Sequence, residues 1–373
     1  MKKNRGNVTI SIIGLGLLGS SLAAAFKKRN PGSRVVGISS PKTIKKAVDL
    51  AIIDKGFDYG ETSEAVAASD LVFLCTPITH VLDTLRQWRA HPPKFRKNCI
   101  VTDVGSTKKK ICQAASKVFS QYKQVFFIGS HPMTGSEKSG IDARDDLLFE
   151  NASWILCPLP GTPDLVLNRL KKNMENLGAR TVIMLPDVHD KVVANVSHLP
   201  QLISTSLAGF IANKRSVVKN ALQVAGGGFR DMTRLANSSL AVWEPIFASN
   251  KDEILRTLSS YLGYLQKIEK AFKRDQFQSF FQPGKMLREK LSEKNKGFTT
   301  ELAEVLLSIP DRRGILQEAL KLVSDAGLNI LDLEVLKVRE GESGTVRIGF
   351  KKRAEAREAS RCLLNHGFKA TIR

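Results

Sequence analysis

The sequence predicts an α/β protein with an N-terminal doubly wound sheet, an all-helical middle part and a small C-terminal α/β unit. Three observations lead to this fold class. The apolar stretch Ile10–Ile13 runs into a turn with three glycines, which opens a helical stretch rich in Ala and Leu. Apolar strands and helical stretches then alternate up to about residue 184. From about Asp187 the apolar residues recur at spacings of three and four, which is the helical period.

Seven short apolar runs predict the strands of the sheet. Because helical stretches alternate with them, we expect a parallel sheet with helices on both faces. Ligands of such sheets bind beyond the carboxyl ends of the strands. The candidate strands are Val8–Ile13, Arg34–Ser39, Leu71–Cys75, Ile100–Val104, Val125–Ile128, Trp154–Cys157 and Thr181–Met184.

The turn Gly14-x-Gly16-x-x-Gly19 predicts dinucleotide binding. Gly14 allows the tight turn, Gly16 lets the backbone approach a pyrophosphate, and Gly19 permits close packing of helix on strand. The helix N-terminus, at Leu17 and Leu18, offers free N–H groups and a partial positive charge to phosphates. Further candidate cofactor contacts stand where later strands end, at Thr76, Pro77 and Asp103.

The same N-terminal stretch has features of a targeting segment. Lys2, Lys3 and Arg5 precede an uncharged run from Val8 to Phe26, as in a signal peptide or a short membrane span. The run is only moderately apolar, because it includes the three glycines and several hydroxyl residues. Its β-branched residues precede the glycines and its alanines follow them, which favours strand, turn and helix. We therefore expect no export and no membrane association.

The composition is typical of a globular protein in a reducing compartment. Of the 373 residues, 42% are hydrophobic and 25% are charged. The five cysteines are odd in number and lack C-x-x-C spacing, which argues against disulfides or zinc and favours the cytoplasm. The net charge of +21 raises the question of nucleic acid, but the basic residues are spread along the chain among acidic ones. We expect no nucleic-acid partner and no metal, and an anionic cofactor and substrate instead.

Four segments are predicted along the chain. Residues 1–185 form the Rossmann-type dinucleotide-binding domain, and residues 186–280 form a helical substrate and dimerisation domain. The stripes Val192–Phe210 and Ile254–Phe272 suit either plain core packing or the interface of a homodimer, and we expect Pro200 to kink the first. The polar residues 281–297 suit a linker, and residues 298–373 form a last domain.

The last domain has the predicted order strand, helix, strand, strand, helix, strand, which is ferredoxin-like. The two middle strands are joined by the turn Glu340-Gly-Glu-Ser-Gly344. The predicted elements are Glu301–Ser308, Arg313–Ala326, Asn329–Val338, Gly344–Phe350, Ala354–Asn365 and Lys369–Ile372.

Two polar clusters follow predicted strands, Asp103–Lys108 and Ser130–Lys138. His131 in the second cluster directly follows an apolar strand, where a histidine is either functional or a hydrogen-bonded loop residue. Ser106 could hydrogen-bond it, and the basic run from Lys108 favours a site. The helical region adds His189, His198 and a glycine-rich tract.

That tract, Gly226–Arg234, ends in an Arg-x-x-x-Arg pair. The glycines predict a turn that places Arg230 and Arg234 on a carboxylate. A surface loop with solvated arginines is the structural alternative.

Together these motifs resemble the prephenate/arogenate dehydrogenase family of tyrosine biosynthesis. The matching motifs stand in the family's order between about residues 8 and 275. They are the Gly14–Gly19 turn, Asp103-Val-Gly-Ser-Thr-Lys108, Gly129–Gly140, Ser197-His-Leu-Pro200 and Gly226–Ala236. The C-terminal unit, with Ile309–Leu316 and Gly327–Ile330, is similar to an ACT regulatory domain, which some members carry.

The resemblance implies oxidative decarboxylation of prephenate, with hydride transfer from C4 to a nicotinamide cofactor and release of the ring carboxylate. On the family pattern, His131 accepts the hydrogen bond of the ring hydroxyl and Ser106 orients both. Arg234 binds a substrate carboxylate. The residues that shape the rest of the pocket are Arg230, Ser136, Glu137 and His198.

The chain departs from the family pattern in two places. Many members have a second histidine where this chain has Gln201, in the part of the site that contacts the substrate side chain. Prephenate and arogenate differ at that side chain, and prephenate is preferred. The second departure is the end of the second strand, where an NAD enzyme usually has an acidic residue. Ser39, Ser40 and Lys42 stand there instead, which favours NADP over NAD unless the lysine-rich helix start is merely solvated.

Three alternatives remain at this stage. The C-terminal domain either binds tyrosine near Pro310–Gly314 or only helps assembly. A protein of another class would keep these domains as a non-catalytic sensor of nucleotide and amino acid that binds DNA. A rival enzyme would be a dehydrogenase of the β-hydroxyacid type.

Overall fold

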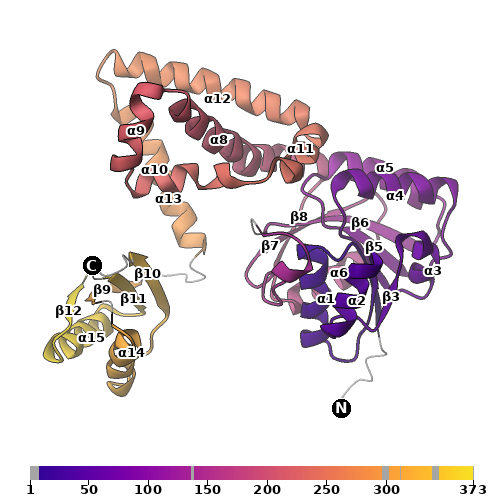
Figure 1. Ribbon diagram of the computed structural model, residues 1–373, viewed down its shortest axis with the longest axis horizontal. Coiled ribbons are helices and arrows are strands. Elements are labelled where there is room, and N and C mark those ends of the chain that lie inside the picture. The colour runs from indigo at the N-terminus through magenta and orange to yellow at the C-terminus, as the bar shows by residue number, and fades with distance from the viewer. Residues whose placement is uncertain (1–7, 136–137, 296–301, 311, 338–343, 373) are drawn as a thin grey trace. The chain divides into compact units, whose positions relative to one another are not determined.

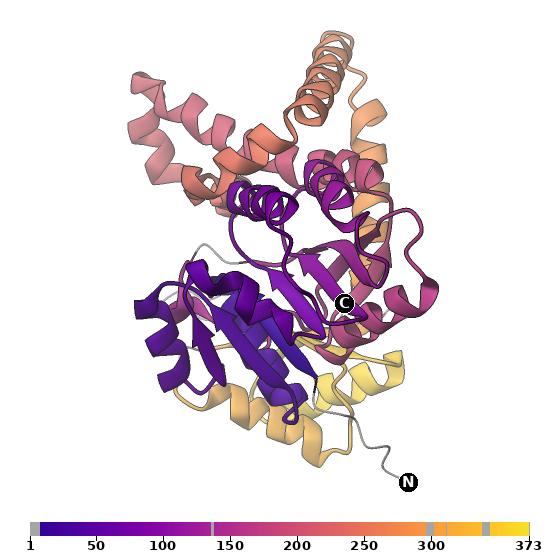
Figure 2. The same ribbon diagram turned by 90° about the vertical axis from the view of Figure 1, so that its right-hand side faces the viewer.

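The computed structural model describes residues 8–135, 138–295, 302–310, 312–337 and 344–372. The chain divides into two compact units, residues 1–263 and residues 264–373. Figures 1 and 2 show the two units in views related by a quarter turn. Among the helices that the structure describes, none is long and apolar enough to cross a membrane.

The first unit is built on an eight-stranded sheet with the order β3-β2-β1-β4-β5-β6-β7-β8. All seven predicted strands are present, and β3, three residues long, is an addition too short to show a periodic pattern. The strands are β1 Thr9–Ile13, β2 Arg34–Ile38, β3 Lys55–Phe57, β4 Leu71–Leu74, β5 Cys99–Asp103, β6 Val125–Pro132, β7 Ser153–Pro158 and β8 Arg180–Ile183.

The sheet is mixed, which corrects the expectation of a wholly parallel one. Strand β7 pairs with β6 in antiparallel direction and with β8 in parallel direction, and the other pairs are parallel. A parallel pair needs a crossover connection, usually an α-helix. The described part of the β6–β7 connection contains no α-helix, only the short 3-10 helix η2, Ile141–Ala143. The pairing with β7 extends β6 to Pro132, so His131 lies inside a strand and opposite Ile155.

Helices cover both faces of this sheet (Figure 1). The helices α1 Leu17–Arg29 and α6 Asp164–Asn176 pack on one face, while α4 Ile78–Ala90 and α5 Lys109–Phe119 pack on the other. The shorter helix α2, Pro41–Asp49, contacts β2 and β3, and α3, Thr62–Ala67, contacts β1 and β2.

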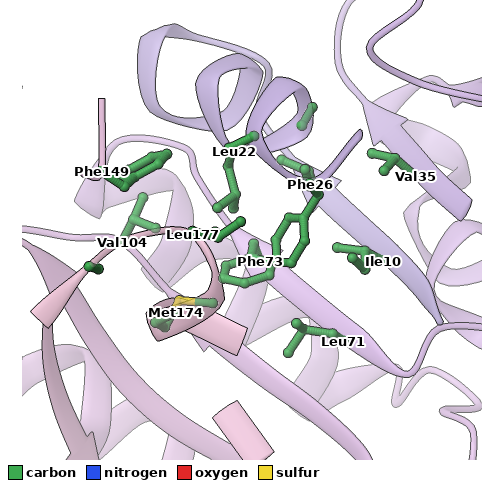
Figure 3. Packing of buried hydrophobic residues seen from close by; sticks show 14 of the residues in the cluster. Ile10, Leu22, Phe26, Val35, Leu71, Phe73, Val104, Phe149, Met174 and Leu177 are labelled. Carbon is green, nitrogen blue, oxygen red and sulfur yellow. The ribbon is translucent and has the colours of Figure 1, made fainter. Parts of the chain in front are cut away.

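The core under α1 explains why the N-terminal apolar run belongs to the fold. Figure 3 shows Leu22 and Phe26 of α1 beside Phe73 of β4, and the rings of Phe26 and Phe73 lie 5.8 Å apart between centroids. Each such buried side chain contributes about 1.5–3 kcal/mol. Strand β1 lies between β2 and β4 in the middle of the sheet. The strand–turn–helix prediction for this stretch is therefore confirmed.

The helical region begins with an almost continuous helix that is interrupted near Pro200. Helix α7, Pro186–Val193, runs into a π-helical turn, Ala194–His198, and then into α8, Leu199–Ala212. Because proline has no N–H, it breaks the regular hydrogen-bond ladder, and the wider turn before it accommodates the break. The other helices of this region are α9 Arg215–Val224, α10 Gly227–Thr233, the 3-10 helix η4 Arg234–Asn237, α11 Leu240–Ser249 and α12 Lys251–Phe272.

The second unit contains helix α13, Gln278–Asn295, where the sequence predicts a linker. The segment is polar, but Lys, Glu, Leu and Arg are good helix formers. Lys285 and Glu289, one helical turn apart, form an ion pair at 3.9 Å. The polar composition of this segment therefore indicates that it is exposed to solvent. It does not indicate that the segment lacks regular structure.

The rest of the second unit is a four-stranded antiparallel sheet with the order β10-β11-β9-β12 and two helices. One core contains side chains of the sheet and of both helices. The predicted turn Glu340–Gly344 falls mainly on residues 338–343, outside the described residues. In chain order the elements are β9 Ala303–Ile309, α14 Ile315–Asp325, β10 Asp332–Lys337, β11 Gly344–Phe350, α15 Arg353–Asn365 and β12 Lys369–Ile372.

Candidate active site

In the turn between β1 and α1, packing requires a glycine at two positions, and the space around the third glycine is open. Gly14 has a φ of +96°, and a Cβ atom there would lie 2.8 Å from Thr76 and 2.9 Å from the carbonyl of Cys75. A Cβ atom on Gly19 would overlap the carbonyl oxygen of Gly14. At Gly16 a Cβ atom would meet nothing within 4 Å. The backbone at Gly16 is therefore accessible to a phosphate.

Polar groups beside this open space fit a dinucleotide. Helix α1 begins at Leu17, so the N–H groups of Leu17 and Leu18 have no carbonyl of a preceding helical turn to bind. The hydroxyl of Thr76 is buried and has no partner among the described residues. Pro77 is exposed and precedes α4. Free N–H groups and a spare hydroxyl are what a pyrophosphate would bind.

The end of β2 has no carboxylate of its own. Ser39 is buried, and its N–H donates to the carbonyl of Phe57 at 3.1 Å. Ser40 is exposed at the start of α2, with its hydroxyl 3.0 Å from that of Thr43. Lys42 is exposed in the first turn of the same helix. These are the groups available to a ribose or its 2′-phosphate at this strand end.

The carboxylate of Asp103 is fully buried and used within the protein. One oxygen accepts from the N–H of Ser130 at 3.1 Å, and the other accepts from the N–H of Gly105 at 2.8 Å and from the ammonium of Lys108. The cofactor contact predicted for Asp103 stays a prediction, and a free carboxylate is not available for it. The carboxylate joins the end of β5 to β6 instead.

Lys108 is likewise not part of a basic surface. Its side chain is fully buried, and its ammonium forms the ion pair with Asp103 and donates to the carbonyl of Ser130 at 2.7 Å. The exposed members of the run are Lys109 and Lys110. The buried pair thus holds the loop before α5 against β6, one residue before His131.

Three buried side chains form a chain of hydrogen bonds that ends at His131. Nδ1 of His131 lies 2.9 Å from Nε2 of His189, and Nδ1 of His189 lies 2.7 Å from a carboxylate oxygen of Asp190. The carboxylate of Asp190 also accepts from the backbone N–H groups of Lys108 and Lys109, at 2.7 and 3.0 Å. The chain therefore connects β6, helix α7 and the start of α5. His131, at its end, is 8% exposed.

Burial keeps the imidazoles of this site neutral. Burial, together with the nearby His189, Lys108 and His198, lowers the pKa of His131 well below its usual value of 6.5. Burial also lowers the pKa of His189, although its hydrogen bond to Asp190 acts in the opposite direction. Burial alone would raise the pKa of Asp190, but hydrogen bonds from His189 and from the two backbone N–H groups outweigh it and lower that pKa. At neutral pH the carboxylate is charged and both imidazoles are neutral.

His198 and Gln201 lie on the buried side of the π turn and of α8. The side-chain amide of Asn250 donates to the backbone carbonyl of Asp190 at 2.8 Å and lies 3.3 Å from Nδ1 of His198. Burial lowers the pKa of His198 to about 4. The amide nitrogen of Gln201 donates to the carbonyl of Leu235 at 2.8 Å, and its oxygen is buried without a partner among the described residues.

The roles of the five remaining predicted site residues are not decided by contacts with His131. Ser106 is half-buried in the loop after β5, and among the described residues no hydrogen bond joins it to His131, whose Nδ1 is taken by His189. Arg230 in α10 and Arg234 in η4 are exposed. Ser136 and Glu137 lie outside the described residues. The roles predicted for these five residues remain predictions.

Sequence reasoning gave no role to His189, Asp190 or Asn250, although the first was noted as a histidine of the helical region. A sequence signal exists, since His189 and Asp190 are adjacent polar residues in a short helix that also contains Val188, Val192 and Val193. Nothing in the sequence shows that this helix packs against the start of α5.

Comparison with known proteins gives the family. The sequence models for the nucleotide-binding and dimerization domains of prephenate dehydrogenase match residues 22–183 and 185–286. The prephenate dehydrogenase of Bacillus subtilis is 32% identical over 364 residues, which cover 96% of each chain. This chain belongs to the prephenate dehydrogenase family. It is therefore an NAD(P)-dependent oxidoreductase, as the sequence predicts.

Solved structures of the family agree with the fold. A prephenate dehydrogenase of A. aeolicus, in complex with hydroxyphenyl propionate and NAD+, has 27% identity and a TM-score of 0.69. The arogenate dehydrogenase of Synechocystis has 30% identity and a TM-score of 0.64. Each comparison covers 78% of this chain and 100% of the other. The family domains end at residue 286, so the assignment of the C-terminal unit stays a prediction.

Proposed function

We propose that this chain catalyses the oxidative decarboxylation of prephenate to 4-hydroxyphenylpyruvate in tyrosine biosynthesis, with NADP or NAD. The observation that carries the proposal is the buried neutral imidazole of His131, in the same unit as an open glycine turn. A neutral imidazole can accept a proton, and burial keeps it neutral at the pH of a cell. The family membership favours this enzyme over a β-hydroxyacid dehydrogenase or a DNA-binding sensor.

The chemistry asks the protein for positioning and one proton acceptor. The bound nicotinamide would accept a hydride from C4 of the substrate ring. His131 would accept the proton of the C4 hydroxyl as the C–O bond gains double-bond character. The ring carboxylate leaves as carbon dioxide, its electron pair makes the ring aromatic, and the proton returns to the oxygen. Aromatisation drives the loss of carbon dioxide, so correct placement of the reacting groups is the larger task.

Charged and polar side chains of both the sheet domain and the helical region would hold the substrate. We assign Arg234 to a substrate carboxylate, because a guanidinium can bind it through two charge-assisted hydrogen bonds. Arg230, Ser136, Glu137 and His198 would shape the pocket, and Ser106 would hydrogen-bond the ring hydroxyl.

A homodimer would use the helical region. Residues 185–286 match the dimerization domain of the family, and large apolar side chains are exposed there. Val224 is 80% exposed and Leu240 is 69% exposed. Exposed apolar area of this kind is typical of an interface between subunits.

We place the enzyme in the cytoplasm, because the five cysteines are free.

Arogenate is a second candidate substrate, and Gln201 is the observation that favours it. The carbonyl of Leu235 can only accept a hydrogen bond, so the amide of Gln201 must present its NH2 group there. The buried amide oxygen then needs a donor from elsewhere. The ammonium group of arogenate could supply one, whereas the keto group of prephenate could not.

NADP would be used at least as well as NAD. At the end of β2 an acidic residue would repel a 2′-phosphate, and this chain has Ser39 and Ser40 in that place. The exposed Lys42 adds positive charge. Lysine binds phosphate as a mobile point charge, so we expect a moderate preference.

The C-terminal unit would be a ferredoxin-like, ACT-like regulatory domain that binds tyrosine. Its strands and helices have the ferredoxin-like order β9-α14-β10-β11-α15-β12. The amino acid would lie near Pro310–Gly314, where the N-terminus of α14 can receive a carboxylate. Deleting residues 298–373 should abolish inhibition by tyrosine. Inhibition that survives the deletion would leave the unit a role in assembly only.

One assay separates the candidate functions. Purified protein is given prephenate or arogenate with NADP or NAD, and formation of the reduced nicotinamide is followed. We expect turnover of prephenate with NADP at a kcat/KM no lower than with NAD. Turnover of arogenate alone would move the assignment to the second candidate. No turnover with either substrate would contradict the proposed function.

A further inference from the structure

We propose that Asp190 and His189 are positioning residues that fix the tautomer of His131, so that its Nε2 carries the free electron pair. This inference deepens the proposed function and rests on it for the role of His131 in catalysis. The assignment of the protons themselves depends on geometry and not on the substrate.

The direction of the hydrogen bonds is set at Asp190. Both of its carboxylate oxygens accept from backbone N–H groups, those of Lys108 and Lys109. A backbone N–H can only donate, so the carboxylate is an acceptor on both oxygens. Its oxygen that lies 2.7 Å from Nδ1 of His189 must therefore accept there as well. Nδ1 of His189 carries a hydrogen.

The tautomer of His189 follows from this. Its side chain is fully buried, and burial lowers its pKa, so the ring carries one hydrogen at neutral pH. Since that hydrogen is on Nδ1, Nε2 of His189 is an acceptor. The partner of Nε2 is Nδ1 of His131, at 2.9 Å.

His131 completes the chain. Its Nδ1 must donate to His189, and burial keeps its own ring neutral. The one hydrogen of the ring is then on Nδ1, and Nε2 has a free electron pair that can accept a proton. Among the described residues, the groups that act on the charge of His131 are Lys108, which pairs with Asp103, and the neutral His189 and His198. Asp190 of α7 lies beyond His189 in the row of hydrogen bonds.

The opposite tautomer would be inactive as a base. If His189 presented a hydrogen to His131, Nδ1 of His131 would accept it and Nε2 would carry the hydrogen. The ring could then donate a hydrogen bond to the substrate hydroxyl but could not accept its proton. The carboxylate of Asp190 excludes this arrangement, because it cannot donate to His189.

Asp190→Ala tests the proposal by removing the acceptor of His189. The donors left there are the backbone N–H groups of Lys108 and Lys109, which favour an acceptor at Nδ1 of His189 and so move the hydrogen of each histidine to Nε2. We expect kcat to fall by about 10²–10⁴, the usual worth of a general base, with KM changed far less. Asp187→Ala is the matched control, since Asp187 lies in the same helix and pairs with Lys109 at 2.9 Å on the surface. It should change kcat less than about twofold, as expected of an exposed ion pair.

His189 gives a second pair of variants in case Asp190→Ala does not fold. In His189→Gln, an amide oxygen can still accept from Nδ1 of His131 and keep its tautomer. In His189→Leu nothing can accept. We expect Gln to retain at least about tenfold more kcat than Leu, because the general base is worth more than that. Equal kcat values in the two variants would show that His189 only fills space.

The tautomer can also be read without substrate. Nitrogen-15 NMR of the wild-type protein, labelled at histidine and assigned with His131→Asn, reports which ring nitrogen carries hydrogen. We expect a protonated Nδ1 and an unprotonated Nε2 for His131 at pH 7. The reverse assignment, or a folded Asp190→Ala variant with nearly wild-type kcat, would overturn the proposal. Failure of the wild type to oxidise prephenate would instead contradict the proposed function and leave the NMR result valid.

Discussion

The glycine turn and the hydrogen-bond chain formed by Asp190, His189 and His131 lie in the same unit, but they are built in different ways. The turn is formed by consecutive residues, Gly14 to Gly19, and its demands are steric, since a side chain at either end would collide with backbone. The hydrogen-bond chain joins His131 to His189, 58 positions apart in the sequence, and Lys108 to Asp190, 82 positions apart. Its requirements are electrostatic. A steric demand leaves a local sequence pattern, whereas an electrostatic one spread over three elements does not. Substitutions in the hydrogen-bond chain should therefore affect function through residues that lie far apart in the sequence.

The largest effect is expected from the residue at the end of the chain. His131→Asn should lower kcat by about 10²–10⁴ with a modest change in substrate affinity, because it removes the proton acceptor. Steady-state kinetics with prephenate measure it. His366→Asn, at an exposed histidine of the second unit, is the control and should leave kcat unchanged. Turnover of His131→Asn near the wild-type rate would remove this residue from the mechanism.

Lys108→Met tests how much the buried ion pair beside the hydrogen-bond chain stabilises the folded protein. The substitution leaves the carboxylate of Asp103 buried without its cation, and breaking a buried pair costs about 3–5 kcal/mol. Chemical denaturation should show this loss in the free energy of unfolding. Lys110→Met is the control, because Lys110 is exposed, and should cost less than about 0.5 kcal/mol. Equal losses in the two variants would show that the pair does not support the fold.

Arg234→Ala tests the residue that we assign to the substrate carboxylate. Loss of a charge-assisted partner of a carboxylate should weaken the binding of prephenate by roughly 2–5 kcal/mol, mostly as a rise in KM. Arg256→Ala, which removes an exposed arginine of α12, is the control. An unchanged KM in Arg234→Ala would mean that another residue binds the carboxylate.

The sequence predicted the first region well and the second only in part. Gly14, Gly16 and Gly19 could be interpreted from their spacing, because each glycine meets a local requirement. His131 was predicted as a site residue from its place after an apolar run, and the structure places it within β6. The ion pair of Lys108 with Asp103 was not predicted, since the two side chains come together only through the turn after β5.

The mistakes in the fold have physical causes of the same kind. The direction of β7 depends on the connection before it and not on the residues of the strand, so an apolar run could not reveal the antiparallel pairing. The polar segment before the C-terminal unit was taken for a linker, although its residues favour a helix. In both cases the local composition was compatible with two structures, and the contacts decided between them.

The smallest expected effect concerns the cofactor, on the side of the first region. Ser39→Asp should lower kcat/KM for NADP at least about tenfold relative to NAD, a difference of about 1.4 kcal/mol, because a carboxylate repels the 2′-phosphate. Kinetics with both cofactors measure the ratio, and Ser33→Asp, just before the start of β2, is the control. Full NADP activity in Ser39→Asp would show that this strand end does not contact the 2′ position. A tenfold preference of the wild type for NAD would contradict the proposed preference.

The pH dependence of kcat/KM for prephenate tests most directly the claim that a buried neutral His131 is the base. Burial lowers the pKa of His131 well below 6.5, so the imidazole accepts a proton at all pH values above that lowered pKa. Activity should be full at neutral pH and should fall as the pH decreases through the lowered pKa, within the range in which the protein stays folded. An acidic limb at or above pH 6.5 would contradict the account, as would a limb that persists unchanged in His131→Asn.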